Sequence, residues 1–330
     1  MKLGTLDDGS RDGTLVVVSA DAQRWLFADG VAPTLQAALD DWAQCEPQLR
    51  ALSQRLADGA GRSIAHPIAG RRFAAPLPRA WQWLDASVYR SHSELLDRLF
   101  GRESVPSERP LMYQGMSHRF LGPTDDVPLP RESDDIDFEG EFAIICDAVP
   151  MGVDASEAIA HIKLVTIVND WSLRAYASSE KKTGFGWILA KPACSMAPFA
   201  VTPDELGPAW RDARVHLDLE IHWNGRRFGH ANGGAMAHGF DELVAHAAST
   251  RDLCAGTIIG SGTVSNDNYR EVGSSCIAER RAIEMLDDGQ AKTPFMRFGD
   301  SVRLEARSPQ GASVFGAIEQ RVVDAGRHAR

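Results

Sequence analysis

Two glutamates stand inside the otherwise apolar part of the segment "DDIDFEGEFAIICDA". At the two-residue period of a β-strand, Asp137, Glu139 and Glu141 share one face, and the aromatic residues between them share the other. Burying neighbouring ionised carboxylates without a partner is costly, because they repel each other and lose their hydration. A hard divalent cation, which prefers oxygen ligands, would satisfy them. The alternative is a solvated strand face that needs no ligand.

Two further carboxylates follow bulky apolar residues. Asp85 ends "WQWLD", and Asp170 ends the run "IKLVTIVND". An acid at the end of a buried element can be delivered into a cleft, where it would add to an oxygen-ligand set. The alternative is that both residues are N-caps, Asp85 of a helix in "ASVYRSHSELL" and Asp170 of one in "WSLRAYASSE".

The elements that must position these acids are mainly strands. Alternating or β-branched runs bounded by turn residues predict strands at "TLVVVSA", "RWLFA", "EFAIICDA", "RVHLDLEIHWNG", "GTIIGSGTV" and "SVRLEARSPQGASVFGAIEQRVV". The tips of "IHWNGRRFG" and "LEARSPQGASVFG" predict hairpin turns. Apolar residues at helical spacing predict helices at "TLQAALDDWAQ" to "LRALSQRLADGA", "SELLDRLFG", "ASEAIAHIKLV" and "FDELVAHAAST". The mixture indicates a strand-rich α+β fold.

The chain of 330 residues is long enough for one large domain with a smaller companion. We place a small N-terminal α+β domain at residues 1–75 and a larger catalytic domain at residues 76–330. The boundary lies in "RRFAAPLPRAWQWLD", where two prolines interrupt the pattern of regular secondary structure.

Composition excludes several classes of partner. The net charge is -10 and no stretch is rich in Lys and Arg, which argues against nucleic acid. No apolar stretch approaches a membrane span and the N-terminus lacks a secretory signal, so we expect no membrane partner and a cytoplasmic location. The five cysteines form no CxxC pair and are interpreted as reduced packing residues. No nucleotide-binding GxGxxG or P-loop spacing occurs.

Six short motifs, taken in order, make the chain resemble the fumarylacetoacetate hydrolase family from about Trp83 to the C-terminus. Asp85 is followed seven residues later by His92, and "MYQGM" is similar to the family's substrate loop. "DFEGEFAII" resembles its Glu-x-Glu strand, "NDWSLR" its "NDWSAR" segment, "ILAKPACSMAPF" its lysine segment and "GSGTVS" its Thr-containing strand end.

The resemblance implies a mixed β-roll fold and a divalent metal, Mg²⁺, Mn²⁺ or Ca²⁺. Its ligands would be Asp85, Glu139, Glu141 and Asp170. The resemblance also implies a homodimer, a small keto acid as substrate and a place in aromatic amino-acid catabolism.

The same resemblance implies roles for residues around the metal. His92 would be the general base, oriented by a glutamate for which Glu279 in "GSSCIAERR" is the best match, with Glu271 and Glu284 as lesser candidates. Lys191 would stabilise a developing oxyanion or carbanion. In isolation His92 would be interpreted as a surface or capping residue, and Lys191 as solvated.

Tyr113, Arg174 and Thr263 match substrate-contacting positions of the family. Each also has a simpler interpretation: a core tyrosine, a helix-surface arginine and a strand-end hydroxyl. The family's acidic residue after the arginine is Ala175 here, so the substrate contacts on that helix differ. The segment "SSEKKTGFGW" is interpreted as a possible lid.

The resemblance favours a metal-dependent hydrolase that cleaves the C–C bond of a fumarylacetoacetate-like 1,3-diketo acid into a carboxylic acid and a keto acid. Alternatives within the family are acylpyruvate hydrolysis, oxaloacetate decarboxylation and hydration or dehydration of 2-keto acids. An alternative outside catalysis is a metal-stabilised binding protein, against which the base His92 and the cation Lys191 argue.

Overall fold

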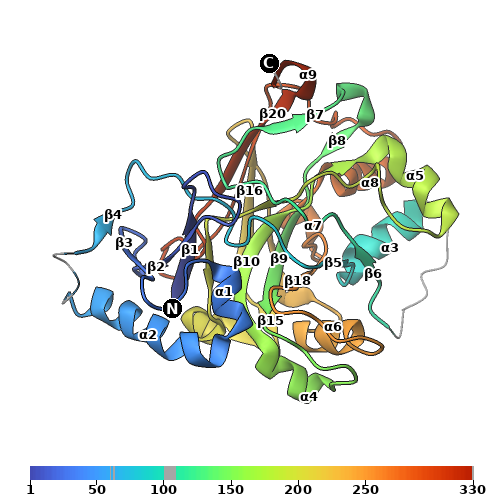
Figure 1. Ribbon diagram of the computed structural model, residues 1–330. Coiled ribbons are helices and arrows are strands. Elements are labelled where there is room, and N and C mark those ends of the chain that lie inside the picture. Colours follow the sequence, from blue (N-terminus) through green and yellow to red (C-terminus); the bar gives the residue numbers. More distant parts are fainter. Residues whose placement is uncertain (60, 62–63, 100–108, 329–330) are drawn as a thin grey trace.

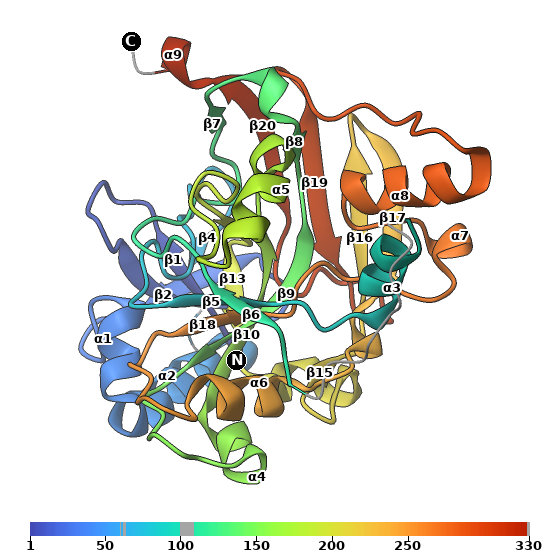
Figure 2. The ribbon, with the colours of Figure 1, turned by 90° about the vertical axis from the view of Figure 1, so that its right-hand side faces the viewer.

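A computed structural model describes residues 1–59, 61, 64–99 and 109–328. Figures 1 and 2 show long central strands with helices around their edges and faces. The predicted strand-rich α+β fold is confirmed.

Within the described residues the larger sheet has eleven strands and carries most of the residues of interest. Its path runs through β4 (His66–Pro67), β3 (Arg24–Phe27), β2 (Thr14–Val18), β1 (Lys2–Leu6), β13 (Phe199–Val201), β10 (Ile162–Asn169), β9 (Gly140–Cys146), β18 (Ile258–Gly260), β5 (Trp83–Ala86) and β6 (Met112–Gln114). Strand β12 (Ser195–Met196) pairs with β10 off this path. Strands β10, β9, β18 and β5 are therefore consecutive neighbours, although they are far apart in sequence.

The second sheet forms the other main layer (Figure 2). Its order is β17 (Arg226–Asn232), β16 (Asp218–Trp223), β19 (Ser301–Ala306), β20 (Ile318–Asp324) and β7 (Val127–Leu129). The shorter pairs are β11 (Ser172–Leu173) with β8 (Ile136–Asp137), and β14 (Trp210–Arg211) with β15 (Arg214–Val215). The predicted hairpin at "IHWNGRRFG" is confirmed, with positive φ angles of 49° at Asn224 and 73° at Gly225.

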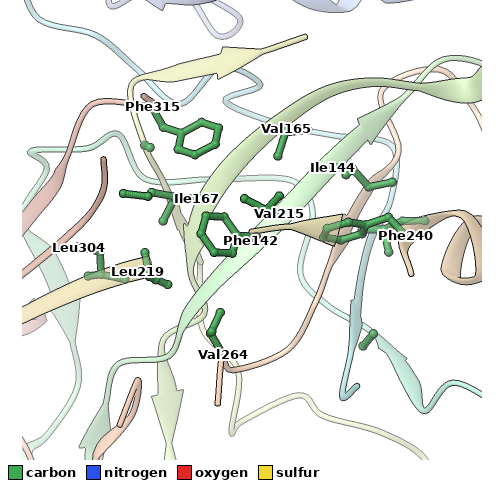
Figure 3. Packing of buried hydrophobic residues seen from close by; sticks show 14 of the residues in the cluster. Phe142, Ile144, Val165, Ile167, Val215, Leu219, Phe240, Val264, Leu304 and Phe315 are labelled. Atoms are coloured by element: carbon green, nitrogen blue, oxygen red, sulfur yellow. The ribbon is translucent and has the colours of Figure 1, made fainter. Parts of the chain in front are cut away.

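Apolar side chains from both sheets meet in one core. Figure 3 shows Phe142 of β9 among residues from other elements, including Leu219 of β16 and Leu304 of β19. Gly140 allows the two sheets to approach closely, because a Cβ there would lie 2.7 Å from the Ile221 side chain. This packing fixes β9, the strand that carries Glu141.

The described helices are α1 (Leu35–Asp40), α2 (Trp42–Ala57), α3 (Arg90–Leu99), α4 (Ala155–Ala158), α5 (Arg174–Thr183), α6 (Phe240–Ala247), α7 (Tyr269–Val272), α8 (Ile277–Asp288) and α9 (Ala325–His328). The helix predicted at "ASEAIAHIKLV" is wrong in its second half, since β10 begins at Ile162. Most of β10 is buried between two neighbouring strands, and its β-branched residues suit that setting better than a helix.

The N-terminal segment is continuous with the rest of the large sheet. Strand β1 pairs with β13 on one side and β2 on the other. Leu3 and Val17 share a buried cluster with Ala143 and Ile145 of β9. The division near residue 75 stays a prediction; the first strands and the later ones are joined by hydrogen bonds and a common core.

All five cysteines are free thiols, and four are buried. Cys254 is exposed, so its interpretation as a packing residue is wrong. None of the helices in the described ranges is long and apolar enough to cross a membrane.

Candidate active site

Three carboxylates from three parts of the large sheet converge. Asp85 lies on β5, Glu141 on β9 and Asp170 directly after β10. One oxygen of each lies within 4.8 Å of the others, and all three residues are buried. Strand β18 lies between β9 and β5. Its Gly260 pairs with Asp85 of β5 on one side and with Ala143 of β9 on the other.

Gly260 leaves the space that these carboxylates fill. A Cβ at this position would lie 2.4 Å from the Trp83 ring, 2.5 Å from Asp85 Oδ1 and 2.8 Å from Glu141 Oε2. Real Cβ atoms do not approach other atoms so closely, so an alanine must displace the acids or the tryptophan.

We expect Gly260→Ala to weaken divalent-ion binding and to destabilise the fold by about 1–3 kcal/mol, the usual cost of overpacking. Calorimetric titration with Mg²⁺ or Mn²⁺ and denaturant unfolding measure the two effects. Gly326→Ala, whose Cβ would meet only Asp324 at 3.3 Å, is the control. Unchanged affinity in Gly260→Ala would contradict the assignment of this space to the acids.

The electrostatics of the cluster fit a cation. Among the described residues neither carboxylate oxygen of Glu141 has a hydrogen-bond partner, although the residue is fully buried. Burial, with the charges of Asp85 and Asp170, raises the pKa of Glu141 well above its usual value. Burial and the charge of Asp170 likewise raise the pKa of Asp85 to about 8. A set of buried carboxylate oxygens with unfilled lone pairs suits Mg²⁺, Mn²⁺ or Ca²⁺.

In chelator-treated protein, we expect stability to fall as pH rises from 5 to 8. A carboxyl whose pKa is about 8 when folded and 3.8 when unfolded keeps its proton only in the native state across this window. Each such group then costs about 1.4 kcal/mol per pH unit. Urea unfolding at the two pH values measures the slope, and Asp85→Asn should flatten it. A metal-free protein that is equally stable at both pH values would contradict this expectation.

Glu139, predicted as a fourth metal ligand, lies outside the group of three converging acids. One of its oxygens accepts a hydrogen bond from Arg174 Nη2, and the other accepts one from Lys191 Nζ at 2.5 Å. Burial alone would raise the pKa of Glu139, but the positive charges of Arg174 and Lys191, with a contribution from His92, hold it below its usual value. The role of Glu139 as a ligand stays a prediction.

Lys191 links Glu139 to the converging acids. Its Nζ donates to Asp170 Oδ2 at 2.5 Å and to Ser172 Oγ at 2.8 Å. Burial would lower the pKa of Lys191, yet Asp170 and Glu139 outweigh it and hold the pKa above its usual value. The Lys191 side chain is only 10% exposed and its ammonium is charged, so the simpler interpretation as a solvated lysine is wrong.

Tyr113 also contacts the acids. Its hydroxyl donates to Asp170 Oδ2 at 2.6 Å, and its ring lies 5.5 Å from Lys191 Nζ. Thr263 is buried after β18, next to Gly262, whose N–H donates to Asp85 Oδ1 at 3.2 Å. Both predicted substrate residues therefore lie on segments that contact the acids, and their roles toward a substrate stay predictions.

His92 on α3 and Glu279 on α8 form a pair. Nδ1 of His92 lies 2.7 Å from Oε2 of Glu279, which is fully buried. Helices α3 and α8 lie side by side in Figure 2, and Leu95 packs with Ile283 between them. The lesser candidates have other partners: Glu271 contacts Asn268 and Glu284 contacts Thr293.

The helix-cap alternatives for the acids are wrong. Asp85 lies within β5, five residues before α3 begins, and the residue preceding α5 is Leu173, not Asp170. A solvated face for Glu139 and Glu141 is also wrong, because they are 5% and 0% exposed. Strand β9 is buried along its whole length, which leaves no solvated face at Glu141.

Asp137, which the strand period places on the same face as Glu139 and Glu141, belongs to a strand of its own. It lies in β8 and is 0% exposed. Oδ1 accepts from Ile277 N–H at 2.7 Å, and Oδ2 accepts from Ala278 N–H at 2.9 Å and from Arg174 Nε at 2.8 Å. Its place on the same predicted strand face as Glu139 and Glu141 was the signal in the sequence.

Arg174, predicted to face a substrate carboxylate, donates to Asp137 and Glu139. Two of its guanidinium nitrogens are thereby committed to carboxylates of the protein. Its place at the start of α5 puts it beside the acids rather than on a helix surface. A contact with substrate stays a prediction.

The predicted lid segment ends in a turn held by Glu180, which the sequence reasoning did not single out. Its carboxylate accepts hydrogen bonds from the backbone N–H groups of Ile188, Leu189 and Ala190. This turn brings the Trp187 ring to 6.3 Å from that of Tyr113. The segment therefore borders the residues that contact Asp170, and movement as a lid stays a prediction.

Fold and site together define an α+β protein with a buried cluster of oxygen ligands beside a histidine–glutamate pair. The family model described as fumarylacetoacetate (FAA) hydrolase C-terminal matches residues 83–323, and that described as fumarylacetoacetase N-terminal domain 2 matches residues 1–79. The chain belongs to the fumarylacetoacetate hydrolase family.

Curated relatives include enzymes of different reaction types. A 2,4-didehydro-3-deoxy-L-rhamnonate hydrolase of Sphingomonas sp. (strain SKA58) is 28% identical over 162 residues, which are 48% of this chain and 54% of the relative. A mitochondrial oxaloacetate tautomerase of Bos taurus is 28% identical over 162 residues, 48% of this chain and 49% of the relative. The matched region thus spans about half the length of each of these two relatives.

Solved structures share the fold. The 5-carboxymethyl-2-hydroxymuconate delta-isomerase of Mycobacterium smegmatis superposes with a TM-score of 0.63 at 21% identity, covering 98% of this chain and 99% of that one. The maleylpyruvate hydrolase of Sphingobium sp. SYK-6, in complex with manganese(II) and pyruvate, has a TM-score of 0.64 at 18% identity, covering 98% and 99%. At these identities the likeness shows the fold alone.

Proposed function

We propose that this protein is a metal-dependent hydrolase that cleaves the C–C bond of a 1,3-dioxo acid of the fumarylacetoacetate type. The observation that carries the proposal is the fully buried Glu141, with two unpartnered oxygens, converging with Asp85 and Asp170. A non-catalytic metal protein would have no use for the His92–Glu279 pair or for a buried Lys191 beside the acids.

Asp85, Glu141 and Asp170 would hold the ion, and Glu139 is the further candidate. A divalent ion bound there would polarise the carbonyl of a chelating dioxo acid as a Lewis acid. The maleylpyruvate hydrolase structure in complex with manganese(II) and pyruvate supports an ion of this type and a site that takes 2-oxo acids. The identity of the ion is a matter for metal analysis.

His92 would act as the general base. A Glu279 carboxylate that accepts from Nδ1–H leaves the lone pair on Nε2, which can take a proton from water. The hydroxide adds to the carbonyl carbon, the C–C bond breaks, and its electron pair passes to the leaving enolate. That enolate takes a proton to give the ketone, and the carbonyl carbon that received the hydroxide leaves as a carboxylic acid.

Lys191 would stabilise the leaving group, and Tyr113 would orient Asp170. The Lys191 ammonium is held in place by Asp170, Glu139 and Ser172, so it can face developing negative charge without reorganising. The Tyr113 hydroxyl already donates to Asp170 and keeps that carboxylate oriented. Both groups are preorganised by the protein rather than by solvent.

An assay of purified protein with Mg²⁺, Mn²⁺ or Ca²⁺ against fumarylacetoacetate, acetylpyruvate and oxaloacetate tests the proposal. Loss of the diketone absorbance, with one ¹⁸O from labelled water in the carboxylic acid product, is the expected result. Acetylpyruvate as the preferred substrate would indicate an acylpyruvate hydrolase, and CO₂ release from oxaloacetate a decarboxylase. Enol–keto interconversion without cleavage would indicate a tautomerase and overturn hydrolysis.

A further inference from the structure

Asp137 connects two parts of the site that are separate in sequence. It lies on β8, and its carboxylate accepts the N–H groups of Ile277 and Ala278, the first two residues of α8. Helix α8 carries Glu279 as its next residue. The carboxylate of Asp137 therefore binds the turn of helix from which Glu279 reaches His92.

The same carboxylate is connected to the acid cluster through side-chain contacts. Asp137 Oδ2 also accepts from Arg174 Nε at 2.8 Å, and a second nitrogen of Arg174 donates to Glu139. Glu139 is in turn bound by Lys191, which contacts Asp170. With three donors, both oxygens of the fully buried Asp137 carboxylate have hydrogen-bond partners.

The N-cap residue of α8 is a weak hydrogen-bond acceptor, so the contribution of Asp137 to capping this helix is large. The N-cap residue is Cys276, whose sulfur accepts the Glu279 N–H at 3.3 Å. Sulfur is a poor acceptor compared with the oxygen of Ser, Thr, Asp or Asn at an N-cap. Two of the three N–H groups of this first turn therefore depend on Asp137, and a negative charge also suits the positive end of a helix.

We infer that Asp137 is the positioning residue for the His92–Glu279 pair. Its one carboxylate binds both the start of α8 and Arg174. It thereby fixes the position of Glu279 against His92 Nδ1 relative to the acid cluster. The consequence of this inference for catalysis rests on the proposed function. Its consequence for the tautomer of His92 does not, because that tautomer is measured without substrate.

The test reads the tautomer of His92 in the Mg²⁺-loaded full chain without substrate. Two-bond ¹H–¹⁵N correlations of the imidazole distinguish Nδ1–H from Nε2–H, and the spectrum of His92→Asn assigns the signal. We expect Nδ1–H in the unaltered protein and a mixture with Nε2–H in Asp137→Asn and Glu279→Gln. Asp137→Glu, which keeps the charge but moves the carboxylate, should also give a mixture and decides the matter if Asp137→Asn does not fold.

Glu305→Gln is the matched control, because Glu305 is also a buried carboxylate, and it accepts from Arg303 and Arg307 in the second sheet. It should leave the His92 signal unchanged. A folded Asp137 variant with the His92 tautomer of the unaltered protein would overturn the inference. A merely structural role would lower thermal stability in both Asp137→Asn and Glu305→Gln without moving this signal.

A double-mutant cycle then connects the tautomer to turnover. If Asp137 acts through Glu279, the kcat of Asp137→Asn/Glu279→Gln should be close to that of Glu279→Gln, with KM little changed. Additive losses would overturn action through Glu279. Absence of turnover in the unaltered protein would count against the proposed function and leave the tautomer result standing.

Discussion

Replacing His92 by alanine should lower kcat by roughly a hundredfold to ten-thousandfold, the range typical for loss of a general base. Nδ1 of His92 is engaged by Glu279, which leaves Nε2 as the nitrogen that can accept a proton. The side chain is not among the converging acids, so metal content should stay as it is. Steady-state kinetics and metal analysis of the same preparation measure the two quantities.

Glu279→Gln should show a smaller loss than His92→Ala, because the base remains but its orientation is lost. Ser93→Ala, at the next residue of α3, is the control: its hydroxyl donates to the backbone carbonyls of Tyr89 and Arg90. Full turnover by His92→Ala would rule out His92 as the base. Loss of metal together with activity would instead place His92 in the ion site.

Glu141→Gln should have opposite effects on metal binding and on the metal-free fold. Removing one of three converging carboxylates should weaken Mg²⁺ or Mn²⁺ affinity by more than about a hundredfold, since even residues one step away from a metal change affinity 10–100-fold. The metal-free variant should be more stable than the metal-free parent at pH 8, because an unpartnered buried carboxylate beside Asp85 and Asp170 is gone. Calorimetric titration and denaturant unfolding measure the two effects.

Glu305→Gln separates this behaviour from the loss of any buried acid. Glu305 is paired with Arg303 and Arg307, so its replacement should destabilise the protein with or without metal and leave metal affinity unchanged. Metal-free Glu141→Gln that is less stable than its parent at pH 8 would show that Glu141 is satisfied by the protein. The acids would then not be a metal site.

Part of the site was readable from single residues. The alternation in "DFEGEFAII" placed Asp137, Glu139 and Glu141 on one strand face, and the apolar run before Asp170 placed a fourth acid at the end of a buried element. Strand periodicity predicted β2, β3, β9, β16, β18, β19 and β20, since hydrophobic patterning is local, but it missed β1, β5 and β13 of the large sheet. It failed at residues 162–165, where a helical beginning runs into β10 and burial between neighbouring strands decided the outcome.

Other residues had no local signal that fixed their partners. The family resemblance made Glu279 a better match than Glu271 or Glu284, but no local pattern pairs it with His92; the packing of α8 on α3 does. Glu180 resembles any helix-surface acid until the chain turns back and presents three backbone N–H groups to it. Such contacts depend on the angle and position of whole elements.

By itself, the sequence determined the strand-rich α+β class, the family motifs and the residue types that can bind a hard cation, because these follow from composition and short-range period. The tertiary structure decided which acids converge: Asp85, Glu141 and Asp170 meet because β5, β9 and β10 lie close in one sheet with Gly260 leaving room on β18. It also directed Glu139 to Arg174 and Lys191 and buried Asp137 under α8. Long-range strand order and helix packing set these contacts, and neither is encoded in the spacing of neighbouring residues.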